Sequence, residues 1–267
     1  MGIDWQLREA GPADARQTVL LLPGGMCSAG SYAELMAEPA LAGTRLVAAT
    51  FPGHAGAPPP DDYSIENYAQ LTSELATRIG ADVVVGFSMG AVIAFEMVVS
   101  GAFTRPAVLL GVSLSTKDER AFFRGLIRLG GVLGDLPFAV LAKGAASMVK
   151  RIPCVGRSPG RVARGFSKER PRDMGKGLRE YLRWLNRDDR PAERLCQAGV
   201  PTWIVHAEKK GDGGLTDDER RTLEACPHAH LVTLPGDVFF IPNEAPGPIA
   251  EVIVDAMRSA APSASES

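Results

Sequence analysis

The sequence is poor in the residues on which disulfide-rich and metal-binding proteins depend. Its four cysteines show neither C-x-x-C spacing nor the regular pattern of a disulfide framework, so we expect scattered reduced thiols. It has four histidines, and none follows His230. No metal-binding or nucleotide-binding motif is present, and Gly24-Gly25 is not followed by the basic residue of a phosphate loop. We therefore expect no metal and no cofactor.

Long apolar runs are also absent. No segment approaches the length of a membrane span, and the N-terminus has no basic stretch followed by an apolar one, so we expect a soluble, cytoplasmic protein. Aromatic residues make up 6% of the chain and are not interleaved with a basic stripe, which argues against nucleic-acid binding. The expected partner is a small-molecule substrate.

The charge of the chain is unevenly distributed. The net charge is −2, but residues 119–194 hold 18 Lys and Arg against 8 Asp and Glu, which leaves −12 for the rest. This predicts a basic segment laid over an acidic core. Two interpretations are open: the basic residues keep solvated helices soluble, or they steer an anionic substrate or an acidic carrier protein toward a site.

The order of apolar segments predicts an α/β fold with a mostly parallel, doubly wound sheet. At 267 residues and 45% apolar content, the chain can fill one such core. We expect residues 1–118 and 191–258 to form this core, residues 119–190 to form a helical cap, and residues 259–267 to be a disordered tail. The expected strands are near Trp5–Arg8 and at residues 17–22, 45–50, 81–87, 107–112, 201–208 and 230–234.

The central motif is Gly86-Phe87-Ser88-Met89-Gly90. It follows the β-branched run Val83–Val85 and leads into apolar residues at helical spacing. This pattern predicts a strand, a sharp turn and a helix, with Ser88 at the tip of the turn. A side chain at Gly86 or Gly90 would collide with the neighbouring strand and helix, so only glycine fits at these two positions.

From about residue 15 to 258 the chain resembles the α/β-hydrolase superfamily. The resemblance rests on five landmarks in the order of the family: Leu22–Gly25, Phe51–Gly56, Gly86–Gly90, Pro201–His206 and Pro242–Pro246. It implies an α/β-hydrolase fold with an inserted helical cap. It also implies that Ser88 is a nucleophile and that the amides of Gly25 and Met89 form an oxyanion hole.

The resemblance is weakest at the acid and the base. Asp212 lies closest to the family's acid position, with Glu208 and Asp118 as alternatives. The family carries histidine after the last strand, but this chain has Asp237. Asp237 is open to three interpretations: a replacement in an inactive descendant, a desolvated base beside apolar residues 238–240, or a ligand for a polar substrate group. His54 is a candidate substitute base.

Three functions fit these residues. The first is an enzyme that acts on a small, partly apolar ester, thioester or lactone through Ser88, with a non-standard base. The second is a non-hydrolytic enzyme of natural-product biosynthesis that uses the oxyanion hole to stabilise an enolate. The third is a ligand-binding protein without turnover.

Overall fold

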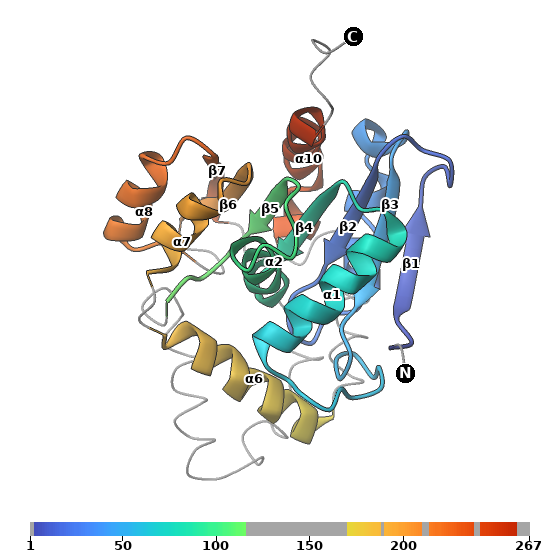
Figure 1. Ribbon diagram of the computed structural model, residues 1–267. Coiled ribbons are helices and arrows are strands. Elements are labelled where there is room, and N and C mark those ends of the chain that lie inside the picture. The colour runs from blue at the N-terminus through green and yellow to red at the C-terminus, as the bar shows by residue number, and fades with distance from the viewer. Residues whose placement is uncertain (1–2, 116–169, 188–189, 210–213, 238–240, 261–267) are drawn as a thin grey trace.

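The computed structural model describes residues 3–115, 170–187, 190–209, 214–237 and 241–260. Within these ranges the chain forms a seven-stranded sheet with helices on both faces (Figure 1). The strands are β1 (Gln6–Ala10), β2 (Thr18–Leu22), β3 (Arg45–Thr50), β4 (Val83–Phe87), β5 (Ala107–Leu110), β6 (Thr202–Lys209) and β7 (Ala229–Asp237). The helices are α1 (Ile65–Ile79), α2 (Met89–Val99), α6 (Pro171–Leu185), α7 (Pro191–Ala198), α8 (Asp217–Glu224), α9 (Ile241–Glu244) and α10 (Pro246–Ala260), with 3-10 turns η1 (Ala29–Tyr32), η2 (Leu35–Ala37) and η3 (Pro39–Leu41).

The sheet has the order β1-β3-β2-β4-β5-β6-β7, and only the β1–β3 pair is antiparallel. Strands β2, β4 and β5 are buried along their whole length, as unbroken apolar runs predict for strands covered on both faces. The chain passes from β2 outward to β3 and returns across β2 to β4, so the winding reverses between β2 and β4. In open parallel sheets, ligands bind at such a reversal, beyond the C-terminal strand ends.

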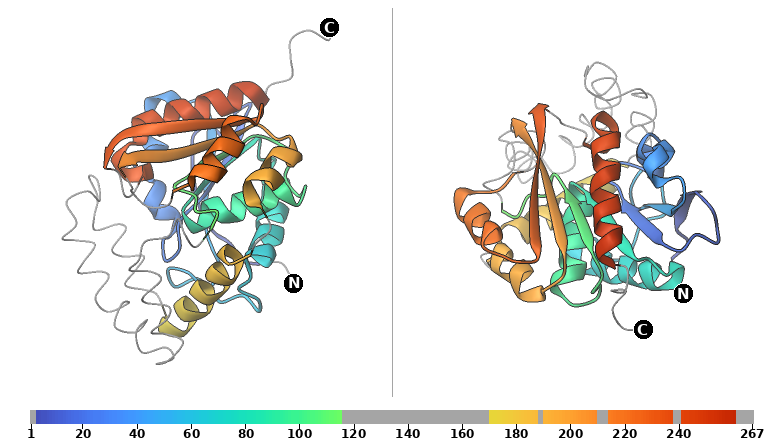
Figure 2. Two further views of the ribbon diagram at one scale, coloured as in Figure 1. Left: turned by 90° about the vertical axis from the view of Figure 1, so that its left-hand side faces the viewer. Right: turned by 90° about the horizontal axis from the view of Figure 1, so that it is seen from above.

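Alternating side chains of the strands divide the core into two layers. Leu20 and Val84 pack with α1, α2 and α7 on one face, whereas Leu21 and Val85 pack with α10 on the other. The left view of Figure 2 shows α10 on the opposite side of the sheet from α1, α2 and α6. Both faces are thus covered, as a doubly wound sheet requires.

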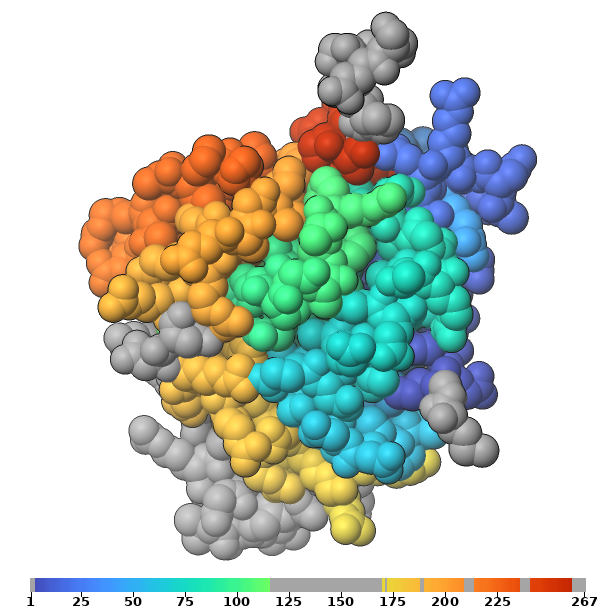
Figure 3. Space-filling model, viewed as in Figure 1, coloured from blue at the N-terminus to red at the C-terminus, as the bar shows by residue number. Residues whose placement is uncertain are grey.

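Helix α6 extends the layer that α1 and α2 form. It lies side by side with α1 in Figure 1, and its surface adjoins that of α1 in Figure 3. Tyr181, Leu182 and Leu185 are buried in the same cluster as α1 and α2, and Arg187 forms an ion pair with Glu66 of α1. This segment of the predicted cap is therefore docked on the core.

The predicted strands are all present, with ends shifted by a few residues. The helix expected near residues 64–79 is α1, which begins after Ser64, whose Oγ accepts a hydrogen bond from the Asn67 amide. Helices α7, α8 and α9 are additions to the prediction. Helix α10 continues to Ala260, so the tail expected from residue 259 is helical at its first two residues. Most of the cap and residues 261–267 lie outside the described residues, so the cap boundaries remain predictions.

Two further sequence expectations concern thiols and membranes. Among the described residues, Cys27, Cys196 and Cys226 are not joined to one another by disulfides, and Cys154 lies outside the described residues. In the described parts of the chain, every helix is too short or too polar to cross a lipid bilayer.

Candidate functional site

Ser88 occupies the turn between β4 and α2. Its backbone angles, φ 50° and ψ −118°, are rarely adopted by a residue with a side chain and cost about 1–3 kcal/mol. Main-chain hydrogen bonds hold the turn, because the Ser88 amide donates to Leu110 O at 2.9 Å, and the Ser88 carbonyl accepts from the Ala91 and Val92 amides at 2.8 and 3.1 Å. The side chain is half-buried. Such strain in a fixed backbone is typical of functional sites.

The two glycines of the motif are required by close backbone contacts. A Cβ atom on Gly86 would lie 2.2 Å from the carbonyl oxygen of Gly90. A Cβ atom on Gly90 would lie 2.3 Å from the carbonyl oxygen of Leu22, at the end of the neighbouring strand β2. The prediction that only glycine fits at both positions is confirmed.

The glycine-rich loop after β2 lies against the Ser88 turn. A Cβ atom on Gly24 would be 3.5 Å from Cβ of Ser88, and one on Gly25 would be 3.6 Å from Sδ of Met89. The loop and the turn meet because β2 and β4 are paired in parallel, with Leu22 opposite Gly86. The structure thus brings together Ser88, Gly25 and Met89, three of the residues singled out from the sequence.

A tight turn shapes this loop. The carbonyl of Gly24 accepts a hydrogen bond from the Cys27 amide at 3.1 Å, which closes a four-residue turn through Gly25 and Met26. Met26 has φ 64°, a left-handed conformation that glycine and asparagine adopt more readily. The hydrogen bond fixes the peptide plane that carries the Gly25 amide.

Side chains from the neighbouring strand β3 and the loop that follows it hold the glycine-rich loop in place. The Met26 amide donates to Nδ1 of His54 at 3.1 Å, and the Ala29 amide donates to Oγ1 of Thr50 at 3.0 Å. Sequence reasoning missed both contacts, because 28 residues separate Met26 from His54. The available signal was the order of the strands, since β3 lies next to β2.

His54 is buried, with 3% of its surface exposed, and its ring packs near Phe51 and Tyr68. Burial lowers the pKa of His54 from 6.5 to about 4, and the nearby Asp173 carboxylate opposes part of this shift. The ring is therefore neutral at pH 7. Because Nδ1 accepts a hydrogen bond, the proton is on Nε2. The Nε2 edge faces α6, where a Cβ atom on Gly177 would lie 3.6 Å from Nε2.

The other three histidines lie on or just before strands β6 and β7. His206 is buried in β6, with Nε2 2.9 Å from the carbonyl oxygen of Val112, and burial lowers its pKa. His228 and His230 are exposed, and the His230 ring stacks on Trp203. His230 lies at the N-terminal end of β7, whereas Ser88 follows the C-terminal end of β4, so these two residues are at opposite edges of a parallel sheet.

Of the candidate acid and base residues, the structure describes Glu208 and the backbone of Asp237. The backbone of Asp237 is at the C-terminal end of β7, paired in register with Lys209 of β6. Glu208 is exposed on β6. Asp212 and Asp118 lie outside the described residues. Among the residues that the structure does describe, no three His, Cys, Asp or Glu side chains are grouped to bind a metal ion.

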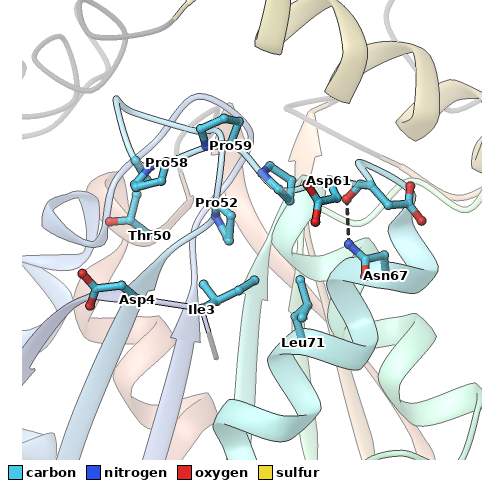
Figure 4. A pocket seen from close by; sticks show the side chains of 12 residues that line it. Ile3, Asp4, Thr50, Pro52, Pro58, Pro59, Asp61, Asn67 and Leu71 are labelled. Carbon is cyan, nitrogen blue, oxygen red and sulfur yellow. Dashed lines mark hydrogen bonds between the residues drawn. The ribbon is translucent and has the colours of Figure 1, made fainter. Parts of the chain in front are cut away.

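A cavity of about 380 Å³ lies beneath the proline-rich loop between β3 and α1 (Figure 4). Three consecutive prolines and the carboxylates of Asp4, Asp61 and Asp62 are part of its wall. Ser88, Gly25, Met89 and His54 are not among the described residues that line it. These lining residues are Ile3, Asp4, Thr50, Pro52, Ala57, Pro58, Pro59, Pro60, Asp61, Asp62, Asn67 and Leu71.

Comparison with solved structures finds the same fold in several enzymes. An X-ray structure of a putative aryl esterase from Burkholderia cenocepacia is similar with a TM-score of 0.76 and 16% sequence identity, covering 97% of both chains. A thermophilic esterase from Thermogutta terrifontis has a TM-score of 0.74 and 15% identity, covering 97% of this chain and 94% of that chain. A thioesterase domain from the curacin biosynthetic pathway has a TM-score of 0.67 and 17% identity, covering 95% of this chain and 100% of that domain.

Sequence comparison gives the family directly. No curated protein matched the chain. The family model described as the alpha/beta hydrolase family matches residues 19–252, which include most of β2, the Ser88 turn and β7. The structural likenesses, at 15–17% identity, agree with this in fold. The chain therefore belongs to the α/β-hydrolase family.

Proposed function

We propose that the chain is a hydrolase that acts on a small, partly apolar ester, thioester or lactone, with Ser88 as the nucleophile. The observation that carries the proposal is the strained backbone of Ser88 beside the glycine loop. If the position of Ser88 had no functional role, the fold would gain stability by relaxing these backbone angles. Related folds in two esterases and a thioesterase domain agree with this reaction class.

In the proposed reaction, the Ser88 hydroxyl adds to the substrate carbonyl while a base takes its proton. The carbonyl electron pair moves onto the oxygen and gives a tetrahedral oxyanion. When the carbonyl re-forms, the alcohol or thiol leaves with the proton that the base had taken. Water then adds to the acyl-serine and releases the acid by the same steps.

The amides of Gly25 and Met89 are the proposed donors to the oxyanion. Met89 is the first residue of α2, so its amide points out of the helix N-terminus, where the helix dipole also favours negative charge. Gly25 lies against the Met89 side chain. One such donor contributes about 10²–10³ in rate, equivalent to about 3–4 kcal/mol.

Asp237 is the proposed base. His54 and His206 are buried, each with a ring nitrogen close to a main-chain group. His228 and His230 are exposed at the N-terminal end of β7 or just before it, at the sheet edge opposite to Ser88. Asp237 is the last residue of β7, and its backbone lies at the C-terminal edge of the sheet, as does Ser88. A carboxylate with an ordinary pKa near 4 is a weak base for a serine hydroxyl, so we expect slow turnover at neutral pH.

Covalent labelling tests the nucleophile. A fluorophosphonate should add one phosphonyl group to the intact protein, and peptide mapping should place it on Ser88. Ser88→Ala should not be labelled, and Ser100→Ala, at the far end of α2, should be labelled like the wild type. A folded wild-type protein that gives no adduct and hydrolyses no p-nitrophenyl ester would refute the proposal.

Exchange of Asp237 tests the base. Asp237→Asn should lower p-nitrophenyl ester hydrolysis, because the amide cannot accept the proton. Asp237→His introduces a group whose usual pKa is near 6.5, so it should raise the rate at pH 7. If neither change alters the rate while Ser88→Ala abolishes it, Asp237 is not the base.

A second candidate function is favoured by the strand order. Strands β5 and β6 lie between β4 and β7, so two strands separate the backbone of Asp237 from the Ser88 turn, and a substrate that extends along this sheet edge would span both. In this reaction Asp237 would take a proton from carbon and the oxyanion hole would stabilise the enolate. It predicts that Ser88→Ala keeps activity on a carbonyl substrate with an acidic C–H, whereas Asp237→Asn loses it.

A further inference from the structure

His54 is separated from Ser88 by the glycine loop. His54 follows β3, the loop follows β2, and Ser88 follows β4, and these strands are neighbours in the order β3-β2-β4. The Nδ1 atom of His54 accepts the Met26 amide of the intervening loop. We infer that His54 is a positioning residue that holds the Gly25 amide in place for the oxyanion, rather than a base that acts on Ser88.

The hydrogen bond matters because the turn has two available conformations. The peptide between Gly25 and Met26 is the central peptide of the turn, and it can adopt either of two opposite orientations. In a type I turn Met26 would have φ near −90°, which suits its side chain, whereas the observed φ of 64° resembles a type II turn. His54 stabilises the second orientation by accepting the Met26 amide.

The two effects are of similar size, so the hydrogen bond decides the outcome. The left-handed conformation disfavours the observed orientation for a residue such as methionine. The buried hydrogen bond, and the cost of leaving the Met26 amide without an acceptor, favour it. Without an acceptor at the Nδ1 position, the central peptide therefore gains little by keeping its orientation. A flip would change ψ of Gly25 and φ of Met26. The Gly25 N–H belongs to the preceding peptide, whose carbonyl accepts from the Cys27 amide in either turn type, so the flip would act on this donor by moving the loop around it.

The surroundings of His54 keep the acceptor available. Only the neutral ring can accept through Nδ1, and burial keeps the ring neutral at the pH of an ordinary assay. The ring is confined by Phe51 and Tyr68 on the core side and by Gly177 of α6 on the other. Helix α6 thus helps to fix the position of His54, which in turn holds the glycine-rich loop through Met26.

Two isosteric substitutions separate the positions of the ring nitrogens. The amide atoms of asparagine lie two bonds from Cβ, as Nδ1 does, whereas those of glutamine lie one bond further, near the position of Nε2. His54→Asn should therefore keep the hydrogen bond to Met26, and His54→Gln should lose it. Tyr68→Phe is the matched control, because it removes a buried hydrogen bond to Pro52 O from the same ring cluster without contact to Met26.

The test measures two quantities in the folded variants. The first is hydrogen exchange of the Met26 amide, which we expect to be protected in the wild type and His54→Asn and to exchange at least about tenfold faster in His54→Gln. The second is the rate constant for fluorophosphonate labelling of Ser88. It should fall at least about tenfold in His54→Gln and stay within about threefold of the wild type in His54→Asn and Tyr68→Phe.

This inference rests on the proposed function, but the two fail in different ways. If wild-type Ser88 is not labelled, the proposed function fails, and Met26 exchange alone decides whether His54 holds the loop. If wild-type Ser88 is labelled and His54→Gln is labelled as fast, the positioning role is refuted and the proposed function stands. Equal exchange of Met26 in the wild type and His54→Gln refutes the inference in either case.

Discussion

Glu96 is a buried carboxylate on α2, the helix that follows Ser88, and its removal gives the sharpest stability prediction. Its side chain is 9% exposed. Oε2 accepts the indole N–H of Trp184 in α6 at 3.0 Å, and Oε1 accepts Nη2 of Arg194 in α7 at 3.3 Å. One carboxylate therefore joins three helices. Glu96→Ala removes both contacts at once.

The cost of this change follows from what it leaves behind. The Trp184 side chain is buried, so its N–H would lose its acceptor at a cost of about 1–3 kcal/mol. The Arg194 side chain is 28% exposed and can turn partly to water, so its share is smaller. Breaking a buried ion pair on one side costs about 3–5 kcal/mol. We expect Glu96→Ala to lower the free energy of unfolding by about 3 kcal/mol, and Glu96→Gln, which keeps one acceptor oxygen, to lower it by about half as much.

Urea unfolding followed by far-UV circular dichroism measures the loss. Glu74→Ala is the matched control, because Glu74 is an exposed glutamate on α1 whose contact is with Gln70 in the same helix, and its removal should change stability by less than about 0.5 kcal/mol. Trp184→Phe, combined with Glu96→Gln in a double-mutant cycle, should give a coupling energy of about 1–2 kcal/mol. A Glu96→Ala variant as stable as Glu74→Ala would refute the reasoning.

Three further outcomes are expected. Burial lowers the pKa of His54 from 6.5 to about 4, so the stability that the neutral ring contributes is present above pH 6.5 and is lost as the pH falls toward 4. In urea titrations the unfolding free energy of the wild type should therefore fall by about 3 kcal/mol relative to that of His54→Asn between pH 7 and 4. A difference that stays constant with pH would contradict this. Gly90→Ala places a Cβ atom 2.3 Å from a backbone oxygen and should cost more than about 3 kcal/mol or prevent folding, as thermal unfolding or soluble yield will report. Gly177 lies in α6, and a Cβ atom added to it would be 3.5 Å from the nearest atom, Cε1 of His54. Since alanine favours a helix more than glycine does, Gly177→Ala should raise the unfolding free energy by about 0.5–1 kcal/mol. A loss of stability would mean that α6 packs against His54 more tightly than this distance indicates.

The sheet could be predicted from the sequence because its strands are apolar on both faces. Runs such as Val19–Leu22 and Val83–Val85 have no other stable place than a covered parallel sheet. Helices α7 and α8 have eight residues each, about two turns, so the helical period repeats too few times to identify them from sequence. Their ends carried clearer signals: Thr216 and Glu219 form a capping box at the start of α8, and Gly199 ends α7 in a left-handed conformation.

The candidate site could be predicted where its residues are close in sequence or belong to a landmark of the family resemblance, as Gly25 does. Gly86, Ser88 and Gly90 belong to one turn, so their spacing carries the geometry. The partners of Glu96 could not be predicted, because Trp184 is 88 residues away and nothing in either segment indicates the other. A glutamate within an otherwise apolar helix did signal that a partner was needed, since buried charges are rarely left alone.

The strand order explains why the loop after β2 is the central element of this site. It touches the Ser88 turn on the β4 side, through Gly24 and Gly25, and His54 on the β3 side, through Met26. A structural change at His54 reaches the Ser88 turn by way of this loop, because β2 lies between β3 and β4. Residues of the β3 side, and α6 packed against them, can therefore alter the oxyanion donors without touching the substrate. Substitutions on the β3 side or in α6 should therefore change the rate at which Ser88 reacts, although they replace no residue that contacts the substrate.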